Sequence, residues 1–281
     1  MSDTILRADV ETLICLAISE DIAGGDITSQ AIFKPEAESR AAIVSKQEGV
    51  FCGSDMVRYV YEMIDPRVSV LPKVKEGDAV GNKKPLVAVS GPTVSVLSGE
   101  RIALNFLQRM SGIATRTSRV VSLLKNTNIR LLDTRKTLPG FRVLDKYAVK
   151  TGGGANHRMG LYDMVMIKDN HIRAAGGIAR AVSMVRERYG DRYRIEVEAA
   201  NQDEVREALE MGVDIIMLDN MDRPAMKAAV ELIRKKAKIE VSGNMDEERI
   251  KGIRDLDVDY VSMGSLTHSA TAFDCSMEFG A

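Results

Sequence analysis

The sequence predicts an α/β protein built from an N-terminal α+β layered domain and an incomplete or open parallel β/α barrel. Short β-rich pieces alternate with turn residues in the first third of the chain, and strand and helix patterns alternate after residue 128. The length of 281 residues is enough for a small domain and a barrel. We therefore expect an α+β domain over residues 1–112, joined by the tail at 269–281, and a barrel domain over 113–268.

The N-terminal domain is expected to begin with a helix and to continue as an antiparallel layer. Apolar residues recur at helical spacing over 9–20, and the pair Gly24-Gly25 would end that helix. A second helix is expected over 98–115, with Ser98 as its N-cap. The tail alternates over 270–279, which favours a strand. The β-rich pieces between the two helices lie at 42–45, 68–74, 80 and 86–89.

The second half is expected to form a parallel sheet, because short apolar strands alternate with amphipathic helices and such units join by right-handed crossovers. The stretch is shorter than the ~250 residues of a typical eight-unit barrel, so an open barrel is expected. The predicted strands lie at 129–132, 165–167, 195–197, 215–218, 239–241 and 260–261. The predicted helices lie at 178–189, 203–211, 224–236 and 246–254.

Polar residues follow each of these strands in turn. The carboxyl ends of parallel barrel strands meet at one rim, where such enzymes hold their active sites. About a third of these residues are expected to be turn formers only. The strand ends supply Asp133, Arg135 and Lys136, then Lys168, Asp169, Asn170 and His171, then Glu198, Asp219 and Asn220, and finally Ser242, Gly243, Asn244, Gly264 and Ser265.

Positive charge is concentrated in one stretch, 131–171, which holds seven Lys or Arg against four Asp in a chain of net charge -1. An arginine fork matches a carboxylate and a lysine suits a phosphate, so the mixture predicts a pocket for a ligand carrying both groups. A solvated, salt-bridged surface is the alternative interpretation.

The remaining strand ends are expected to serve other parts of the same ligand. Small polar residues after the last two strands favour a phosphate site. The acidic residues Glu198 and Asp219 suit ribose hydroxyls or a Mg²⁺ ion that keeps several waters. Glu196 shares a strand face with Glu198, and we expect it to pair with a lysine of the barrel.

Composition argues against several classes of protein. A pI near 6.4 and 5% aromatic residues are unlike a nucleic-acid binder. No apolar run reaches the length of a membrane span, and acidic residues near the start argue against a signal peptide. The cysteines Cys15, Cys52 and Cys275 show no metal-ligand or disulfide pattern, which favours a reducing compartment, the cytoplasm.

Three runs resemble those of the quinolinate phosphoribosyltransferase family: 133–140 (DTRKTLPG), 153–158 (GGANHR) and 167–171 (IKDNH). The resemblance covers nearly the whole chain. It implies a pentosyl-type glycosyltransferase of NAD biosynthesis that uses Mg²⁺. Its reaction converts quinolinate and 5-phosphoribosyl-1-pyrophosphate to nicotinate mononucleotide, pyrophosphate and CO₂. It also implies a homodimer with a shared active site, or a multiple of that dimer.

Matched residue by residue, the resemblance implies that Arg135, Arg158 and Arg101 of the partner subunit clamp the quinolinate carboxylates. Catalytic roles fall to Lys136, Lys168, Glu198 and Asp219, the last two also as ligands of Mg²⁺, directly or through water. The other expected substrate-binding residues are Thr134, His157, Ser242, Gly243, Asn244, Gly264 and Ser265.

Three other functions compete with this one. A related phosphoribosyltransferase could use another heteroaromatic acid with the same phosphate-side residues. A Schiff-base lyase could use Lys168, which ends a barrel strand as such lysines do. A protein that only binds anions could keep the same residues without turnover. A lysine-borne swinging arm at Lys83-Lys84 is disfavoured, because those residues beside Pro85 suit an exposed edge turn.

Overall fold

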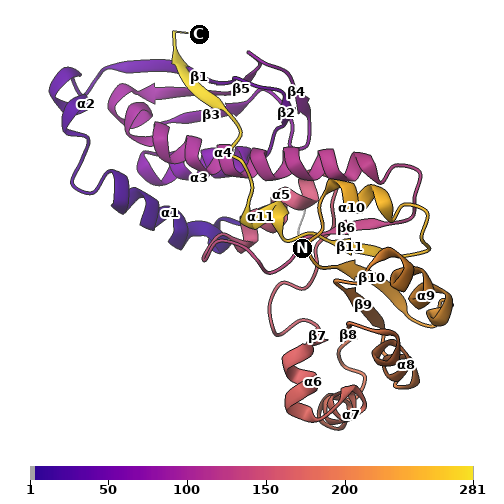
Figure 1. Ribbon diagram of the computed structural model, residues 1–281. Coiled ribbons are helices and arrows are strands. Elements are labelled where there is room, and N and C mark those ends of the chain that lie inside the picture. The colour runs from indigo at the N-terminus through magenta and orange to yellow at the C-terminus, as the bar shows by residue number, and fades with distance from the viewer. Residues whose placement is uncertain (1–3, 281) are drawn as a thin grey trace. The chain divides into compact units, whose positions relative to one another are not determined.

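The computed structural model describes residues 4–280 and divides them into two compact units (Figure 1). The first unit holds the described residues up to Ser118, the segment Thr137–Gly153 and the residues from Leu266 on. The second unit holds Arg119–Lys136 and Gly154–Ser265. None of the helices in residues 4–280 has the length and apolar character needed to cross a bilayer.

The first unit is built on an antiparallel sheet of four strands in the order β12-β1-β5-β3. The C-terminal strand β12 pairs along β1, which places the end of the chain in the N-terminal sheet. A two-stranded ribbon, β2-β4, accompanies it. The strands are β1 (Glu38–Ser45), β2 (Gly49–Val50), β3 (Ser69–Pro72), β4 (Ala79–Val80), β5 (Pro85–Pro92) and β12 (Cys275–Phe279).

Helices accompany this sheet, and several differ from the sequence predictions. The prediction that Ser98 caps the long helix is wrong: α4 begins at Thr93, and the Ser98 hydroxyl donates to the Val94 carbonyl inside it. The helices are α1 (Arg7–Asp21), α2 (Ile27–Ile32), α3 (Ser54–Ile64), α4 (Thr93–Leu123), α5 (Arg142–Thr151) and α11 (Ser265–His268).

Helix α3 lies in a stretch where the sequence predicts only β-rich pieces and turns. Its Val and Tyr residues have high strand propensity, but one face, including Met56 and Val60, is fully buried. A residue distant in sequence completes its start, because the Glu76 carboxylate accepts the Ser54 backbone N-H and hydroxyl at 2.7 Å each. Tertiary burial and a distant cap therefore outweigh local propensity here.

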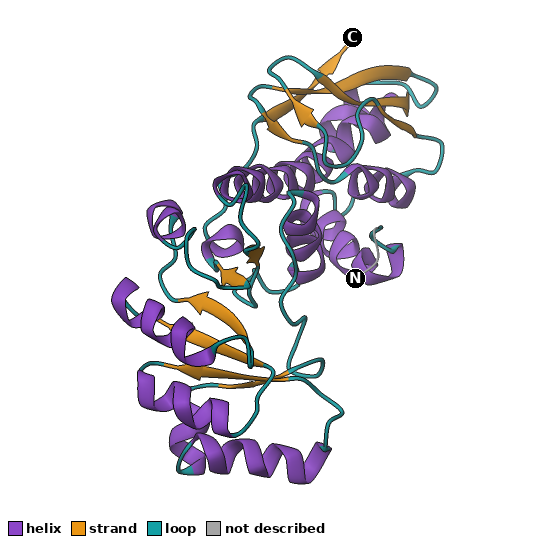
Figure 2. Cartoon of the chain, turned by 90° about the vertical axis from the view of Figure 1, so that its right-hand side faces the viewer, coloured by secondary structure: helices purple, strands orange, loops and turns teal. Residues whose placement is uncertain are grey.

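The second unit contains a six-stranded, all-parallel sheet in the order β6-β11-β10-β9-β8-β7 (Figure 2). Strands β6 and β7 are the two ends of that order, which confirms the open parallel β/α barrel. The strands are β6 (Arg130–Leu132), β7 (Val165–Ile167), β8 (Ile195–Ala199), β9 (Ile215–Asp219), β10 (Lys238–Ser242) and β11 (Tyr260–Ser262).

Three helices of the second unit begin at side chains that cap them. Asn201, Asp222 and Asp246 accept backbone N-H groups at the starts of α8, α9 and α10. The helices are α6 (Asp169–Ala175), α7 (Ile178–Tyr189), α8 (Gln202–Glu210), α9 (Arg223–Ile233) and α10 (Glu247–Gly252).

Candidate active site

The predicted site residues, except Arg101, all lie in the second unit. Most of them are at or just after the carboxyl ends of its parallel strands, whereas His157 and Arg158 lie in the segment between α5 and β7. Thr134, Arg135 and Lys136 follow β6, Lys168 follows β7, and Glu198 belongs to β8. Asp219 and Ser242 are the last residues of β9 and β10, Gly243 and Asn244 follow β10, and Gly264 and Ser265 follow β11. Because the strands are all parallel, these positions lie together at the carboxyl-terminal end of the sheet.

Lys168 and Glu198 form an ion pair between neighbouring strands. The Lys168 Nζ lies 2.6 Å from Glu198 Oε1, and the lysine side chain remains 42% exposed. This leaves the ammonium within reach of a ligand at the rim.

The ends of β9 and β10 are joined by a chain of amide hydrogen bonds. Asn220 donates to Asp219 Oδ2 and Asn244 donates to Asn220 Oδ1, each at 3.0 Å. Gly243 has φ +94°, and a Cβ there would lie 2.3 Å from Asn220 Oδ1. Only glycine therefore lets the backbone approach so closely. Asn220 was not among the predicted site residues. Its φ of 53° lies in the left-handed region, which asparagine adopts more readily than most residues.

Asp133 organises the segment that carries His157 and Arg158. It is fully buried, accepts the His157 backbone N-H at 2.9 Å and accepts Asn156 Nδ2 at 2.6 Å. From the sequence, Asp133 is expected at the rim without a role. This role is not visible in the sequence, because the hydrogen-bond partner His157 lies 24 residues away.

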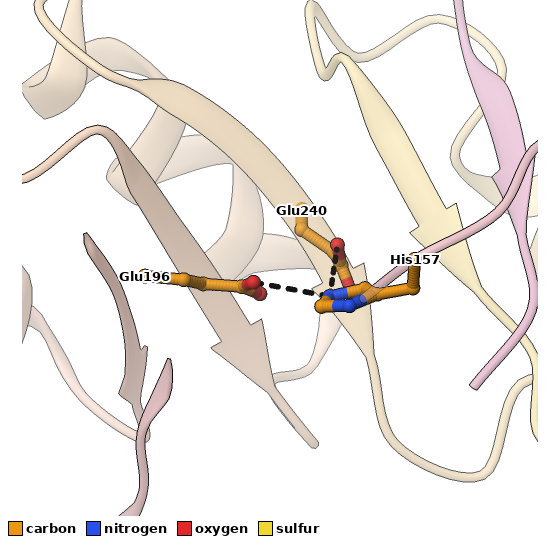
Figure 3. A group of neighbouring side chains, drawn as sticks. All are labelled: His157, Glu196 and Glu240. Carbon is orange, nitrogen blue, oxygen red and sulfur yellow. Dashed lines mark ion pairs between the residues drawn. The ribbon is translucent and has the colours of Figure 1, made fainter. Parts of the chain in front are cut away.

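His157 points between two buried glutamates (Figure 3). Its Nε2 lies 3.0 Å from Glu196 Oε2 and 3.5 Å from Glu240 Oε2, and both glutamate side chains are 0% exposed. The expectation that Glu196 pairs with a lysine is therefore wrong, because a histidine from a distant loop occupies that position. Burial raises the pKa of Glu196, although the hydrogen bond to His157 opposes the rise.

The two nitrogens of the His157 ring have different partners. Nδ1 accepts the Arg158 backbone N-H at 2.7 Å, so in the neutral ring the proton is on Nε2. Burial by itself lowers the pKa of His157, but the two carboxylates outweigh burial and raise it to about 9. A second proton would have to displace the Arg158 N-H from Nδ1. Nε2 carries a proton in both charge states.

This cluster of His157, Glu196 and Glu240 is the group of His, Cys, Asp and Glu side chains in residues 4–280 that is compact enough for a metal ion. A histidine that binds a metal through Nε2 must lose that proton, and it normally donates from Nδ1 to an acceptor. Here Nδ1 accepts instead. The polarity of the ring therefore fits an Nε2-H that faces the two carboxylates better than a metal ligand.

Arg158 is buried and donates from Nη1 to the Met164 carbonyl at 3.1 Å. Burial and the positive charge of Arg135 both lower its pKa. Two guanidinium groups are thus held close enough to repel each other, an arrangement that an anionic ligand would relieve. Arg101 lies in the first unit on the exposed side of α4.

Comparison with known proteins agrees with this architecture. The family models for the N-terminal and C-terminal domains of quinolinate phosphoribosyl transferase match residues 26–111 and 113–278. A probable nicotinate-nucleotide pyrophosphorylase [carboxylating] of Bacillus subtilis is 42% identical over 92% of this chain and 89% of that protein. Quinolinate phosphoribosyltransferase [decarboxylating] 2, mitochondrial, of Nicotiana glauca is 40% identical over 96% of this chain and 82% of that protein.

Solved structures agree as well. NadC from Streptococcus pyogenes superposes with a TM-score of 0.95 at 38% identity, covering 99% of this chain and 98% of that one. The nicotinate-nucleotide pyrophosphorylase from Francisella tularensis gives a TM-score of 0.93 at 36% identity with the same coverage of both chains. The resemblance read from the three sequence runs is thereby confirmed, and the chain belongs to the quinolinate phosphoribosyltransferase family.

Proposed function

We propose that this protein transfers the phosphoribosyl group of 5-phosphoribosyl-1-pyrophosphate to quinolinate with decarboxylation. The products are nicotinate mononucleotide, pyrophosphate and CO₂. The observation that carries the proposal is the row of cationic and acidic side chains at one edge of a parallel sheet, from Arg135 and Lys136 through Lys168, Glu198 and Asp219. That edge can hold two anionic reactants side by side, and the names of the relatives support the choice of reactants.

Quinolinate carries two carboxylates, and the guanidinium groups of Arg135 and Arg158 suit them. Each charge-assisted hydrogen bond contributes roughly 1.5 to 3 kcal/mol, so several are needed to hold a dianion beside pyrophosphate. Arg158 is supported for this task by its buried side chain and its bond to the Met164 carbonyl. Thr134 borders Arg135 in the chain and completes the proposed quinolinate side. His157 borders Arg158, and its ring lies between Glu196 and Glu240.

The phosphoribosyl side is assigned to lysines, carboxylates and small residues. Lys136 and Lys168 neutralise phosphate charge, and Glu198 and Asp219 bind ribose hydroxyls. Positive charge develops on the ribose as pyrophosphate leaves, and fixed carboxylates stabilise it more in that transition state than in the ground state. The 5-phosphate is assigned to small polar residues at the ends of β10 and β11, namely Ser242, Gly243, Asn244, Gly264 and Ser265.

Glu198 and Asp219 also fit the needs of Mg²⁺, which binds through one or two carboxylates and substrate phosphates and keeps several waters. They come from the paired strands β8 and β9. Bound there, Mg²⁺ would neutralise charge on the leaving pyrophosphate. Attack by the pyridine nitrogen makes a cationic ring, which stabilises the electron pair left on the ring carbon when the adjacent carboxylate departs as CO₂. A proton from solvent then takes the place of the carboxylate. No covalent enzyme nucleophile is needed.

The proposed assembly is a homodimer, or a multiple of one, in which Arg101 of the partner subunit reaches the quinolinate. The exposed position of Arg101 on α4 is compatible with this role. A cytoplasmic location is proposed from the cysteines, which are all free.

Steady-state assays with quinolinate and, separately, with nicotinate test the proposed reaction. Quinolinate labelled in the carboxylate that departs should release labelled CO₂ and one pyrophosphate per nicotinate mononucleotide, only with 5-phosphoribosyl-1-pyrophosphate present. Nicotinate serves as the matched control, because it lacks the carboxylate that leaves. Turnover on nicotinate alone would favour a related phosphoribosyltransferase. Borohydride trapping of an adduct at Lys168 would favour a lyase, and binding without pyrophosphate release would favour an anion-binding protein.

A further inference from the structure

We propose that Glu196 and Glu240 are positioning residues: they hold the ring of His157 and, through it, the segment 155–158 that presents Arg158. The inference rests on the proposed function for its substrate, because Arg158 is assigned to quinolinate. It adds two residues in the barrel interior that the sequence resemblance did not assign.

The segment 155–158 closes onto the free edge of the sheet at β6. Ala155 donates to the Leu131 carbonyl at 2.8 Å, and Asp133 donates back to the Ala155 carbonyl at 3.1 Å. Ala155 thereby forms a parallel bridge with Leu132. This edge matters because β6 has a strand neighbour on one side only, β11. The backbone of the segment is thus anchored at its start, and Asp133 anchors it again at the His157 N-H.

The side chain of His157 anchors the segment from the other direction. It reaches Glu196 on β8 and Glu240 on β10, two strands separated by β9 in the sheet. In barrels, side chains from alternate strands share one interior layer, and these two glutamates form part of such a layer. One ring therefore connects the open edge of the sheet to its middle.

The two glutamates have no evident alternative purpose. Both are 0% exposed, and in the described part of the chain no group other than His157 lies within ion-pairing or hydrogen-bonding distance of their carboxylates. Burying a carboxylate costs several kcal/mol unless it is paired. Apolar side chains would fill the same space with a smaller desolvation penalty. We therefore infer that the role of the two glutamates is to hold His157.

What they hold leads directly to Arg158. His157 Nδ1 accepts the Arg158 N-H at 2.7 Å, so turning the ring moves the acceptor of that backbone bond. In the neutral ring, Nε2 faces two carboxylates and Nδ1 accepts the Arg158 N-H, so the ring has one orientation. Arg158 is then preorganised before quinolinate arrives, which lowers the entropic cost of binding.

Kinetics of four variants test the positioning role. Glu196→Ala and Glu240→Ala should raise the KM for quinolinate by about tenfold each, with a smaller change in kcat and little change in the KM for 5-phosphoribosyl-1-pyrophosphate. Glu196→Gln and Glu240→Gln should restore most of the affinity, because an amide oxygen still accepts the Nε2 proton. Glu210→Gln, an exposed residue at the end of α8, is the control.

A second measurement does not depend on activity. The chain has three histidines, so nitrogen-15 histidine NMR spectra will be simple to assign. The His157 Nε2 proton should exchange slowly with water in the wild type and in both Gln variants. In the Glu196→Ala/Glu240→Ala double variant it should exchange fast, while the His171 and His268 signals stay unchanged.

Several outcomes would overturn the proposal. A folded Ala double variant with an unchanged KM for quinolinate and a slowly exchanging Nε2 proton would remove both glutamates from this role. An equal rise in the KM for quinolinate and in the KM for 5-phosphoribosyl-1-pyrophosphate would indicate a general loss of structure instead. A shift of the Nε2 signal on adding Zn²⁺ or EDTA would identify a metal site. Absence of wild-type turnover would contradict the proposed function, while the NMR result would still decide whether the glutamates hold the ring.

Discussion

Lys168 Nζ lies 2.6 Å from Glu198 Oε1, which joins the carboxyl ends of the neighbouring strands β7 and β8. The pair holds a cation and a carboxylate where the proposed reaction needs both. A second ion pair of the same length, Lys238 with Asp259, lies at the start of β10 and so at the amino-terminal end of the parallel strands. The two pairs have similar geometry and differ in their place relative to the strand ends.

That contrast gives the first prediction. Glu198→Gln should lower kcat/KM by about 10²-fold, because the variant removes a carboxylate that stabilises charge developing on the ribose. Lys238→Ala should leave kcat/KM within about twofold, since an exposed ion pair contributes little. Steady-state assays of both variants make the comparison, and equal effects would remove the Lys168–Glu198 pair from the active site.

Arg135→Lys should raise the KM for quinolinate by at least about tenfold, because a point charge does not replace a bidentate guanidinium. The KM for 5-phosphoribosyl-1-pyrophosphate should change less. Arg130→Lys, at an exposed position at the start of β6, is the matched control. Unchanged quinolinate kinetics in Arg135→Lys would exclude this arginine from the carboxylate clamp.

Gly243→Ala should disrupt the loop after β10. The new methyl group would meet Asn220 Oδ1 at 2.3 Å, and alanine would be strained at φ +94°. We expect a loss of about 1–3 kcal/mol in the free energy of unfolding together with weaker binding of 5-phosphoribosyl-1-pyrophosphate. Gly252→Ala has open space around its Cβ and should change neither quantity. Denaturant unfolding and calorimetric titration measure both.

Asp65 should make the stability of the first unit depend on pH. Hydrogen bonds from Arg67 above all, with others from Ser95 and the backbone, lower the pKa of Asp65. A lowered folded-state pKa gives stability that is present above the unfolded value, near 3.8, and is lost as the pH falls below it. Asp65→Asn should therefore destabilise at pH 7, and the difference from wild type should begin to shrink as the pH falls from 5 to 3. A difference from wild type that is constant across this range would contradict the argument.

Mixing two inactive variants tests the shared active site. Hybrid dimers of Arg101→Ala and Lys168→Ala subunits would carry one site with both defects and one site with neither. Random exchange of subunits should restore about a quarter of wild-type activity, since half the dimers are hybrids with one intact site each. Each variant alone is the control. No recovery after verified subunit exchange would argue against a contribution of Arg101 to the partner subunit's site.

The sequence by itself determined the order of elements in the second half and the chemistry at the strand ends. Strand β7 and helix α7 begin and end where the periodicity placed them, because short strands and amphipathic helices with clear boundaries depend on local pattern. The alternation of strands and helices required a parallel sheet. A parallel sheet in turn gathers residues as distant as Arg135 and Asp219 along one edge.

Only the tertiary structure decided which side chains meet. Helices α3 and α5 are not predicted from the sequence, because buried faces and distant caps, such as Glu76 for α3, stabilise them more than local propensity does. The partnership of His157 with Glu196 and Glu240 joins residues 39 and more positions apart, on an edge segment and two separate strands. Hydrogen bonds and buried charges act over a few ångströms, so such partners are set by the fold in three dimensions and leave no periodic trace in the chain.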